Sequence, residues 1–377
     1  MMRSKRCFAL FAAMITLLRC TLPRQFLVSA AGESCCTVLM EADSGVVLDG
    51  SSYDQICGAG SLTKLMTVYL TALAINEGRL TAESIVLAPA AAQEQKGAVI
   101  WLETGDKISV GDLLKAVIIG NANDAAVTLA CAIGGTERQF VMDMNSAAFT
   151  LGLRNTRFAD ATGNSAENTS TPRDIALLCR ALLDFPDLTP IFTTWRDFVR
   201  DGATELVSEN TLTKNYGGLL GFKAGHGDAS GYTLAVAAER EGFCCIAVVM
   251  GCADEDGRFA QGKSLLAKGF AGYTVTTPDF STEFMKPVSV RHGMDAAVLT
   301  EPQALFSAAV PKGESISCVV ILPQYVEAPV ARGDVIGRVA FYCGNTLLYD
   351  TALCAAADIE RRNFGDAFAL LLGNMFK

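Results

Sequence analysis

The sequence predicts an α+β fold, in which an antiparallel sheet flanked by helices is followed by a small all-β domain. Apolar residues follow strand-like patterns at 36–48 and 219–250 and recur at helical spacing between these segments. After about residue 275 the helical spacing disappears. Half of the 377 residues are hydrophobic and 19% are charged, enough for a sizeable core. We expect a first domain at 32–275 and an all-β domain at 276–360.

Residues 1–31 have the three-part pattern of an export signal peptide. Basic residues at positions 3, 5 and 6 precede an apolar run at 7–18, and small residues follow at 29–31. The run is too short to cross a bilayer, which takes about 20 residues, so we prefer a cleaved signal to a retained membrane anchor. We expect cleavage near Ala30 or Ala31 and an exported mature protein.

Two hairpins are expected to form the sheet of the first domain. One lies at 36–48 around a turn at 43–45, and the other joins strands at 231–238 and 243–250 through the turn at 239–242. Because the hairpins lie at opposite ends of the domain, we expect one sheet assembled from both ends.

Helical spacing predicts the elements between the hairpins. Residues 61–77 would form a helix with one buried stripe. Ser109 and Asp112 resemble a capping box before a helix at 113–119. Further helices are expected at 127–132, 139–151 and 263–273.

The last hundred residues predict strands and then one helix. Short alternating runs at 316–322, 335–343 and 346–353 are separated by turns that contain glycine. Residues 361–377 would form an amphipathic helix, with Phe364, Phe368 and Leu371 on its apolar face. Docking on the β domain and peripheral contact with a membrane both fit this helix.

The charge balance excludes several classes of function. The chain has 31 Lys and Arg against 40 Asp and Glu, and five of the basic residues lie in the expected signal. Phosphate binding needs clustered Lys and Arg, so we expect no nucleic acid partner. The histidines are His226 and His292, too few for most His-based zinc sites. No metal and no organic cofactor is implied.

The chain has thirteen cysteines, of which eleven remain without the signal. Most lie in apolar runs, where Cys behaves as a small core residue. In strands, Cys244 and Cys245 would point to opposite faces. We expect buried free thiols; a disulfide framework and metal binding are favoured less.

Residues with catalytic chemistry are concentrated at the start of the first helix. Ser61 and Lys64 are three residues apart, so on a helix they project from one face. The helix N-terminus and partial burial would disfavour a protonated Lys64, and a neutral Lys can take the proton from a serine. On spacing alone, an N-cap Ser and a surface Lys also fit.

Two later segments complete a set of motifs. Asn121-Ala122-Asn123-Asp124 and Lys223-Ala224-Gly225-His226 occur in the order in which S-x-x-K serine hydrolases carry their second and third motifs. With GSLTKLMT, GNANDAAV, MNSAAFTLGLRNTRFADATG, TSTPRDIALL and GFKAGHGDASGYTLAVAA, the chain resembles low-molecular-weight penicillin-binding proteins, the serine-type D-alanyl-D-alanine carboxypeptidases. The resemblance spans nearly the whole mature chain.

The resemblance implies a β-lactamase/transpeptidase-like catalytic domain. It also implies an enzyme that removes the terminal D-alanine of peptidoglycan stem peptides through an acyl-enzyme and that binds β-lactams such as penicillin. Such an enzyme would work outside the cytoplasm, at the cell wall or the outer face of the cytoplasmic membrane.

The resemblance also implies roles for individual residues. Ser61 would be the nucleophile, Lys64 its general base, and Asn123 a catalytic residue that hydrogen-bonds the substrate amide. The backbone N–H groups of Ser61 and His226 would form the oxyanion hole. The substrate site would consist of Asn121, Lys223, Ala224, Gly225 and His226.

Two motif positions depart from the family pattern. Asn121 stands where Ser is usual, and an amide cannot pass a proton on as a hydroxyl can. Ala224 stands where Thr is usual, which removes a hydrogen bond worth about 1.5–3 kcal/mol to a charged group. We expect a slow or altered enzyme, and a catalytically impaired peptidoglycan-binding homologue is the alternative.

Residues 257–264 suggest a third class of function, nucleotide binding. They match the G-x-x-x-x-G-K-S pattern of a phosphate-binding loop. Acidic residues at 254–256 precede the pattern, and the preceding strand belongs to a hairpin and not to a parallel crossover. We therefore prefer a loop that leads into a packing helix.

Overall fold

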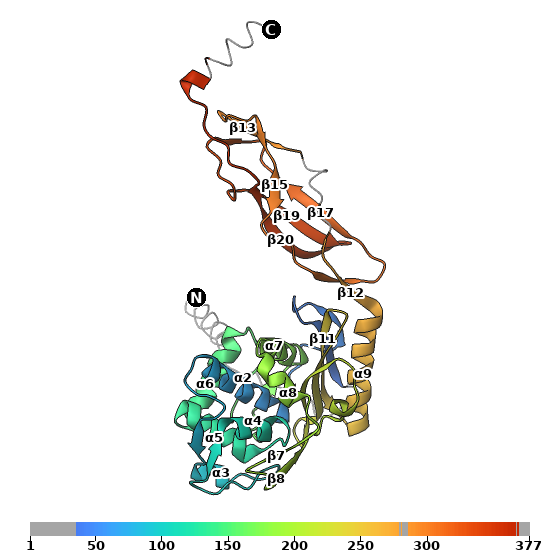
Figure 1. Ribbon diagram of the computed structural model, residues 1–377. Helices are drawn as coiled ribbons and strands as arrows, with labels where there is room; N and C mark the ends of the chain where they lie inside the picture. Colours follow the sequence, from blue (N-terminus) through green and yellow to red (C-terminus); the bar gives the residue numbers. More distant parts are fainter. Residues whose placement is uncertain (1–34, 279, 281–285, 367, 369–377) are drawn as a thin grey trace, which may run out of the picture.

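The computed structural model describes residues 35–278, 280, 286–366 and 368 (Figure 1). The signal expected at 1–31 lies outside the described residues, as does most of the helix expected at 361–377. The described part has a mixed first domain followed by a β domain, which confirms the predicted fold class.

The sheet of the first domain has five antiparallel strands in the order β2-β1-β11-β10-β9. The strands are β1 (Cys36–Glu41), β2 (Val47–Ser51), β9 (Leu219–Gly227), β10 (Gly231–Arg240) and β11 (Phe243–Cys252). Because β1 pairs with β11, both predicted hairpins join one sheet, as expected. The strand β9 lies at its edge, beside the helices.

Helices pack on both faces of this sheet (Figure 1). One face is covered by α9 (Glu255–Gly272). The other faces a group of helices: α2 (Lys64–Asn76), α3 (Ala90–Gln93), α4 (Val110–Ile118), α5 (Asn123–Gly134), α6 (Glu137–Thr150), α7 (Pro172–Leu183) and α8 (Thr189–Phe192). The Ser109 hydroxyl accepts the Asp112 N–H at 3.1 Å, which confirms the capping interaction.

Short segments connect these helices. Two-stranded ladders pair β3 (Cys57–Gly58) with β6 (Thr169–Ser170), β4 (Ile85–Leu87) with β5 (Lys107–Ser109), and β7 (Arg196–Val199) with β8 (Thr204–Val207). The 3-10 turns are η1 (Gly60–Thr63), η2 (Pro186–Leu188) and η3 (Thr211–Lys214).

The helix expected at 61–77 differs from the prediction in its burial. It begins with η1 and continues as α2, and α2 is buried on nearly all sides, including Thr67 and Thr71. The prediction of a single buried stripe was therefore wrong, because α2 runs through the centre of the domain. Its buried hydroxyls find partners inside and outside the helix: Thr71 donates to the Thr67 carbonyl and Thr67 to the Ala161 carbonyl, both at 2.8 Å.

The helix α9 overturns the prediction of a loop at 257–262. It begins at Glu255, with the Asp254 side chain accepting the Gly257 N–H, so residues 257–264 are helical throughout. Arg258 is buried and donates to the Gly225 carbonyl at 2.6 Å. A phosphate-binding loop needs free backbone N–H groups in a turn, and this helix does not supply them.

The second domain consists of strands, as predicted. A four-stranded sheet has the order β15 (Thr300–Pro302), β20 (Thr346–Ala355), β19 (Val335–Cys343) and β17 (Ile316–Ile321). A second sheet combines β14 (Ala297–Val298), β13 (Val288–Arg291) and β18 (Tyr325–Glu327). Finally, β12 (Tyr273–Thr276), which follows α9, pairs with β16 (Ala308–Pro311).

One pair of cysteines corrects the expectation of free thiols. Cys35 and Cys252 form a disulfide, because the pairing of β1 with β11 brings their Cα atoms to 4.7 Å. Most of the remaining described cysteines are buried and free, as expected. Cys244 and Cys245 contact separate apolar clusters on the two faces of the sheet, also as expected.

Candidate active site

Ser61 lies where α2 meets the edge of the sheet. It is in η1, one turn before α2, and only 9% of its surface is exposed. The strand β9 passes directly over it: a Cβ on Gly225 would lie 2.3 Å from the Ser61 Cβ. Only glycine lets the strand approach this closely, so Gly225 sets the distance between Ser61 and β9.

Lys64 is the first residue of α2 and is 2% exposed. Its ammonium nitrogen donates to the Thr162 carbonyl at 2.7 Å. The Asp160 carboxylate accepts backbone N–H groups of Thr162 and Ser165, at 2.8 and 2.6 Å, and so holds this loop in place. Burial, followed by the charge of Lys223, lowers the pKa of Lys64 to about 7. The residue can therefore be neutral near physiological pH.

The second motif lies at the start of α5. Asn121 has φ +56°, a left-handed conformation that Asn tolerates better than most residues. Its amide nitrogen donates to the Ser61 hydroxyl oxygen at 3.1 Å and to Glu209 Oε1 at 3.0 Å. Asn123 is 4% exposed, and its amide nitrogen donates to the Lys96 carbonyl at 2.6 Å. Of the two asparagines, Asn121 contacts Ser61.

The third motif lies on β9. The Lys223 ammonium donates to the Val117 carbonyl at 2.9 Å, and burial lowers the pKa of Lys223 to about 8, against the opposing charge of Glu209. Ala224 is buried in the apolar cluster that includes Phe259 of α9, so its methyl group offers no polar contact. The His226 ring is largely exposed and stacks on Tyr232.

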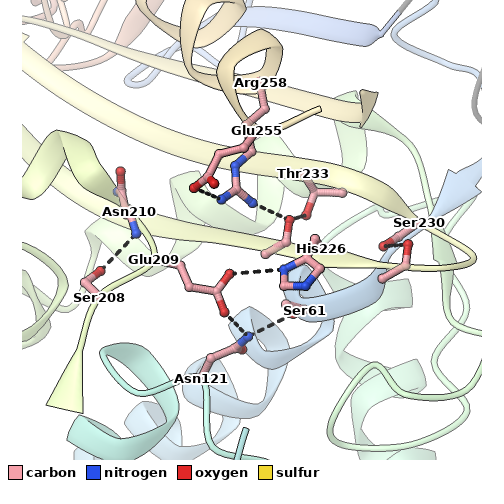
Figure 2. A network of polar contacts seen from close by, with 12 residues as sticks. Ser61, Asn121, Ser208, Glu209, Asn210, His226, Ser230, Thr233, Glu255 and Arg258 are labelled. Carbon is pink, nitrogen blue, oxygen red and sulfur yellow. Dashed lines mark hydrogen bonds and ion pairs between the residues drawn. The ribbon is translucent and has the colours of Figure 1, made fainter. Parts of the chain in front are cut away.

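Glu209 is a member of the site that sequence reasoning missed. It lies between β8 and η3, and Figure 2 shows its carboxylate between the Asn121 amide and the His226 ring. One oxygen accepts from Asn121, and the other is 3.8 Å from His226 Nδ1. No sequence signal marked it, because its contacts join segments 88 residues apart.

The structure thus brings together most of the predicted site residues. Ser61 lies under β9, close to Gly225 and in contact with Asn121. Lys64 follows Ser61 by one helical turn, with its ammonium on the Thr162 carbonyl, and Lys223 is buried on β9. Asn123 is turned toward a backbone carbonyl. Thr162, whose carbonyl accepts a hydrogen bond from Lys64, was likewise not predicted from the sequence. Within the described part of the chain, no group of three or more His, Cys, Asp or Glu could hold a metal ion. A buried hydroxyl beside a lysine of lowered pKa can carry out nucleophilic acyl transfer.

Two family models match this chain. Residues 28–254 match the model of D-alanyl-D-alanine carboxypeptidase, and residues 282–361 match the C-terminal domain of penicillin-binding protein 5. The chain belongs to the D-alanyl-D-alanine carboxypeptidase family. The family's members are hydrolases, which favours an active enzyme over the impaired homologue that Asn121 and Ala224 brought into consideration.

Known members of the family resemble the chain along most of its length. The D-alanyl-D-alanine carboxypeptidase DacF of Bacillus subtilis is 29% identical over 341 residues, which is 89% of this chain and 88% of that protein. The solved structure of penicillin-binding protein 5 from Haemophilus influenzae is 27% identical, with a TM-score of 0.76, and covers 90% of this chain and 100% of its own. Penicillin-binding protein D2 from Listeria monocytogenes, solved in its ampicillin-bound form, is 26% identical with a TM-score of 0.58, and covers 65% of this chain and 98% of its own.

Proposed function

We propose that Ser61 and Lys64 carry out the D-alanyl-D-alanine carboxypeptidase reaction of this family. The observation that carries the proposal is the buried Lys64, whose pKa lies near 7, one helical turn from a buried serine. The substrate is a peptide that ends in D-alanyl-D-alanine, and the products are free D-alanine and the shortened peptide. Peptidoglycan stem peptides have this chemistry.

The reaction proceeds through an acyl-enzyme. Lys64 takes the hydroxyl proton while the Ser61 oxygen attacks the carbonyl carbon of the penultimate D-alanine. The C–N bond then breaks, and the departing D-alanine amine takes a proton. Water hydrolyses the resulting ester, which frees Ser61.

Proton delivery to the leaving group differs from the family pattern at Asn121. An amide cannot relay a proton, so Lys64 both accepts the proton from Ser61 and gives it to the leaving amine. Asn121 instead donates an N–H to the Ser61 oxygen and stabilises the charge that develops there.

Residues of β9 bind the substrate. Lys223 supplies positive charge for the terminal carboxylate, assisted by the backbone around Gly225. The backbone N–H groups of Ser61 and His226 form the oxyanion hole. Asn123 binds the substrate amide, for which its side chain has to leave the Lys96 carbonyl. Ala224 lines the site through its backbone, since its methyl group is buried.

The location of the enzyme follows from its substrate and from residues 1–31. Peptidoglycan lies outside the cytoplasmic membrane, and we propose that the N-terminal signal exports the chain to the cell wall or the outer face of that membrane. No helix among the described residues is long and apolar enough to cross a membrane. The Listeria relative was solved in its ampicillin-bound form. We propose that β-lactams acylate Ser61 of this chain.

The test is release of D-alanine from a peptide ending in D-alanyl-D-alanine. Ser61→Ala should abolish release because the nucleophile is removed. Ser146→Ala, on the exposed side of α6, is the matched control and should release D-alanine at the wild-type rate. Release by Ser61→Ala at the wild-type rate would overturn the proposal.

A further inference from the structure

Glu209 introduces a negative charge into a site that must bind a substrate carboxylate. Its position is well defined by its neighbours: the Ser208 N–H donates to the Trp195 carbonyl at 2.9 Å, and the Asn210 side chain accepts the Leu212 N–H at 3.2 Å. The Glu209 side chain is two-thirds buried. A partly buried charge costs free energy unless a partner compensates for it, so a neighbour of Glu209 must offset this cost.

The Asn121 amide is the partner that compensates for the Glu209 charge. In its present orientation, both contacts to Glu209 and Ser61 are made by the amide nitrogen, while the buried Asn121 Oδ1 has no hydrogen-bond partner among the described residues. A buried unpaired oxygen costs about 1–3 kcal/mol. If the amide were reversed, its oxygen would face the Glu209 carboxylate. The carboxylate therefore holds the amide in the orientation shown in Figure 2.

The orientation of the amide decides where the Ser61 proton points. While Asn121 donates an N–H to the Ser61 oxygen, Ser61 cannot donate its own proton to Asn121 and keeps it for Lys64. In the reversed orientation, Asn121 Oδ1 would accept the Ser61 hydroxyl proton and divert it from the base.

We propose that Glu209 is a positioning residue for the nucleophile: it holds the Asn121 amide so that Asn121 donates to the Ser61 oxygen and the Ser61 proton is left for Lys64. The proposal rests on the proposed function of Ser61 and Lys64. It explains how a site with Asn in place of the usual Ser aligns its nucleophile. Glu209 and Asn121 act as one unit that orients the Ser61 hydroxyl, while Lys64 alone transfers the proton.

The charge of Glu209 also acts on the groups around it. One carboxylate oxygen of Glu209 lies 3.8 Å from His226 Nδ1. The negative charge raises the pKa values of Lys64 and Lys223, whereas burial lowers them. Asp160 is the other acid that raises the pKa of Lys64. Loss of the Glu209 charge therefore lowers the pKa of Lys64, and the acidic limb of the acylation rate moves to lower pH.

The test is the second-order rate constant for acylation by a fluorescent penicillin, measured by stopped flow with the full chain. Glu209→Gln keeps the length of the side chain and loses its charge, and Glu209→Asp keeps the charge but withdraws it from Asn121 by one methylene group. At the pH of maximal rate, both should react about ten-fold more slowly than wild type, the value of one hydrogen bond. The Asp side chain no longer reaches Asn121, and the Gln amide can donate as well as accept, so it no longer fixes the orientation of the Asn121 amide. Only Glu209→Gln, which loses the charge, should move the acidic limb of the pH–rate curve for acylation to lower pH.

A double-variant comparison separates the contact from the charge. Asn121→Ser removes the amide that Glu209 holds, so adding Glu209→Gln to it should produce no further loss at the pH of maximal rate. The same ten-fold loss in both backgrounds would overturn the proposal. So would a Glu209→Gln variant that acylates at the wild-type rate, or one that loses only hydrolysis of the acyl-enzyme, since Glu209 would then act on water.

The wild-type protein distinguishes this proposal from the function on which it rests. If wild-type Ser61 is acylated and Glu209→Gln equals wild type, only the positioning proposal fails. If wild type is neither acylated nor releases D-alanine, the proposed function fails, and the positioning proposal fails with it.

Discussion

At the residue scale, the burial of Lys64 and Lys223 connects the fold to the chemistry. Both ammonium groups donate to backbone carbonyls, of Thr162 and Val117, that lie far from them in sequence. Burial keeps both pKa values well below that of a free lysine. The proposed mechanism needs the two residues in opposite protonation states: Lys64 neutral, to act as a base, and Lys223 charged, to bind a carboxylate.

These requirements predict a bell-shaped pH profile. Lys64 loses its proton as the pH rises through about 7, so kcat/KM for D-alanine release should rise there. Lys223 loses its charge as the pH rises through about 8, so kcat/KM should fall above that value. Steady-state rates between pH 5.5 and 10 measure the profile. A rate that stays constant across this range would contradict the assignment of both lysines.

At the element scale, the approach of β9 to η1 creates the site. The clearest test is Gly225→Ala, whose added methyl group would overlap the Ser61 side chain. We expect acylation to fall by a hundred-fold or more, because misplacement of the reacting groups by about 1 Å costs that much. Gly217→Ala, where a Cβ meets nothing within 4 Å, is the matched control. Normal acylation by Gly225→Ala would show that β9 is not held against Ser61.

The disulfide is a second feature at this scale, because it joins the residue before β1 to the end of β11. It closes a loop of more than 200 residues and should stabilise the fold by about 2–4 kcal/mol. Thermal unfolding should therefore occur at a lower temperature after reduction. Cys35→Ser should unfold at that lower temperature with or without reductant. Equal unfolding temperatures for oxidised and reduced wild type would argue against a stabilising bond.

Patterns within single elements were readable from the sequence. The turns of both hairpins, the capping pair Ser109 and Asp112, and the spacing of Ser61 and Lys64 depend on neighbouring residues. Contacts between elements that are distant in the sequence could not be predicted from it. Glu209 meets Asn121, and Cys35 meets Cys252, only after the chain has folded.

The errors on α2 and α9 have the same cause. The polar residues of α2 are buried because partners such as the Ala161 carbonyl reach them from another segment. The glycines of α9 indicated a loop, yet a Cβ on Gly262 would lie 2.6 Å from Leu234 Cδ2. Glycine is used there for close packing of the helix on the sheet, at a cost of about 1 kcal/mol in helix propensity.

At the scale of the whole molecule, the catalytic domain continues through α9 into the β domain. The backbone ladder of β12 with β16 and a bond from the Lys312 ammonium to the Phe270 carbonyl, at 2.8 Å, join the two. The predicted boundary at 275 and 276 falls within β12. Phe364 and Phe368, near the chain end, are exposed, and their rings stack on each other.

Peripheral membrane contact by residues 361–377 remains a prediction, and flotation with liposomes tests it. The mature chain should float with anionic vesicles, and a chain lacking residues 363–377 should not, because the apolar face of the helix is removed. Equal flotation of the two proteins would contradict membrane contact. D-alanine release in solution should be unchanged by the deletion, since the proposed active site lies in the first domain.

Mass spectrometry after incubation with penicillin tests the central claim most directly. The intact mass of the wild-type chain should rise by that of one penicillin, and the modified peptide should map to Ser61, whereas Ser61→Ala should remain unmodified. Lys64→Ala should fold normally and acquire the adduct at least a hundred-fold more slowly, because the base is lost. An unmodified wild-type chain, or an adduct on another serine such as Ser230, would contradict the account.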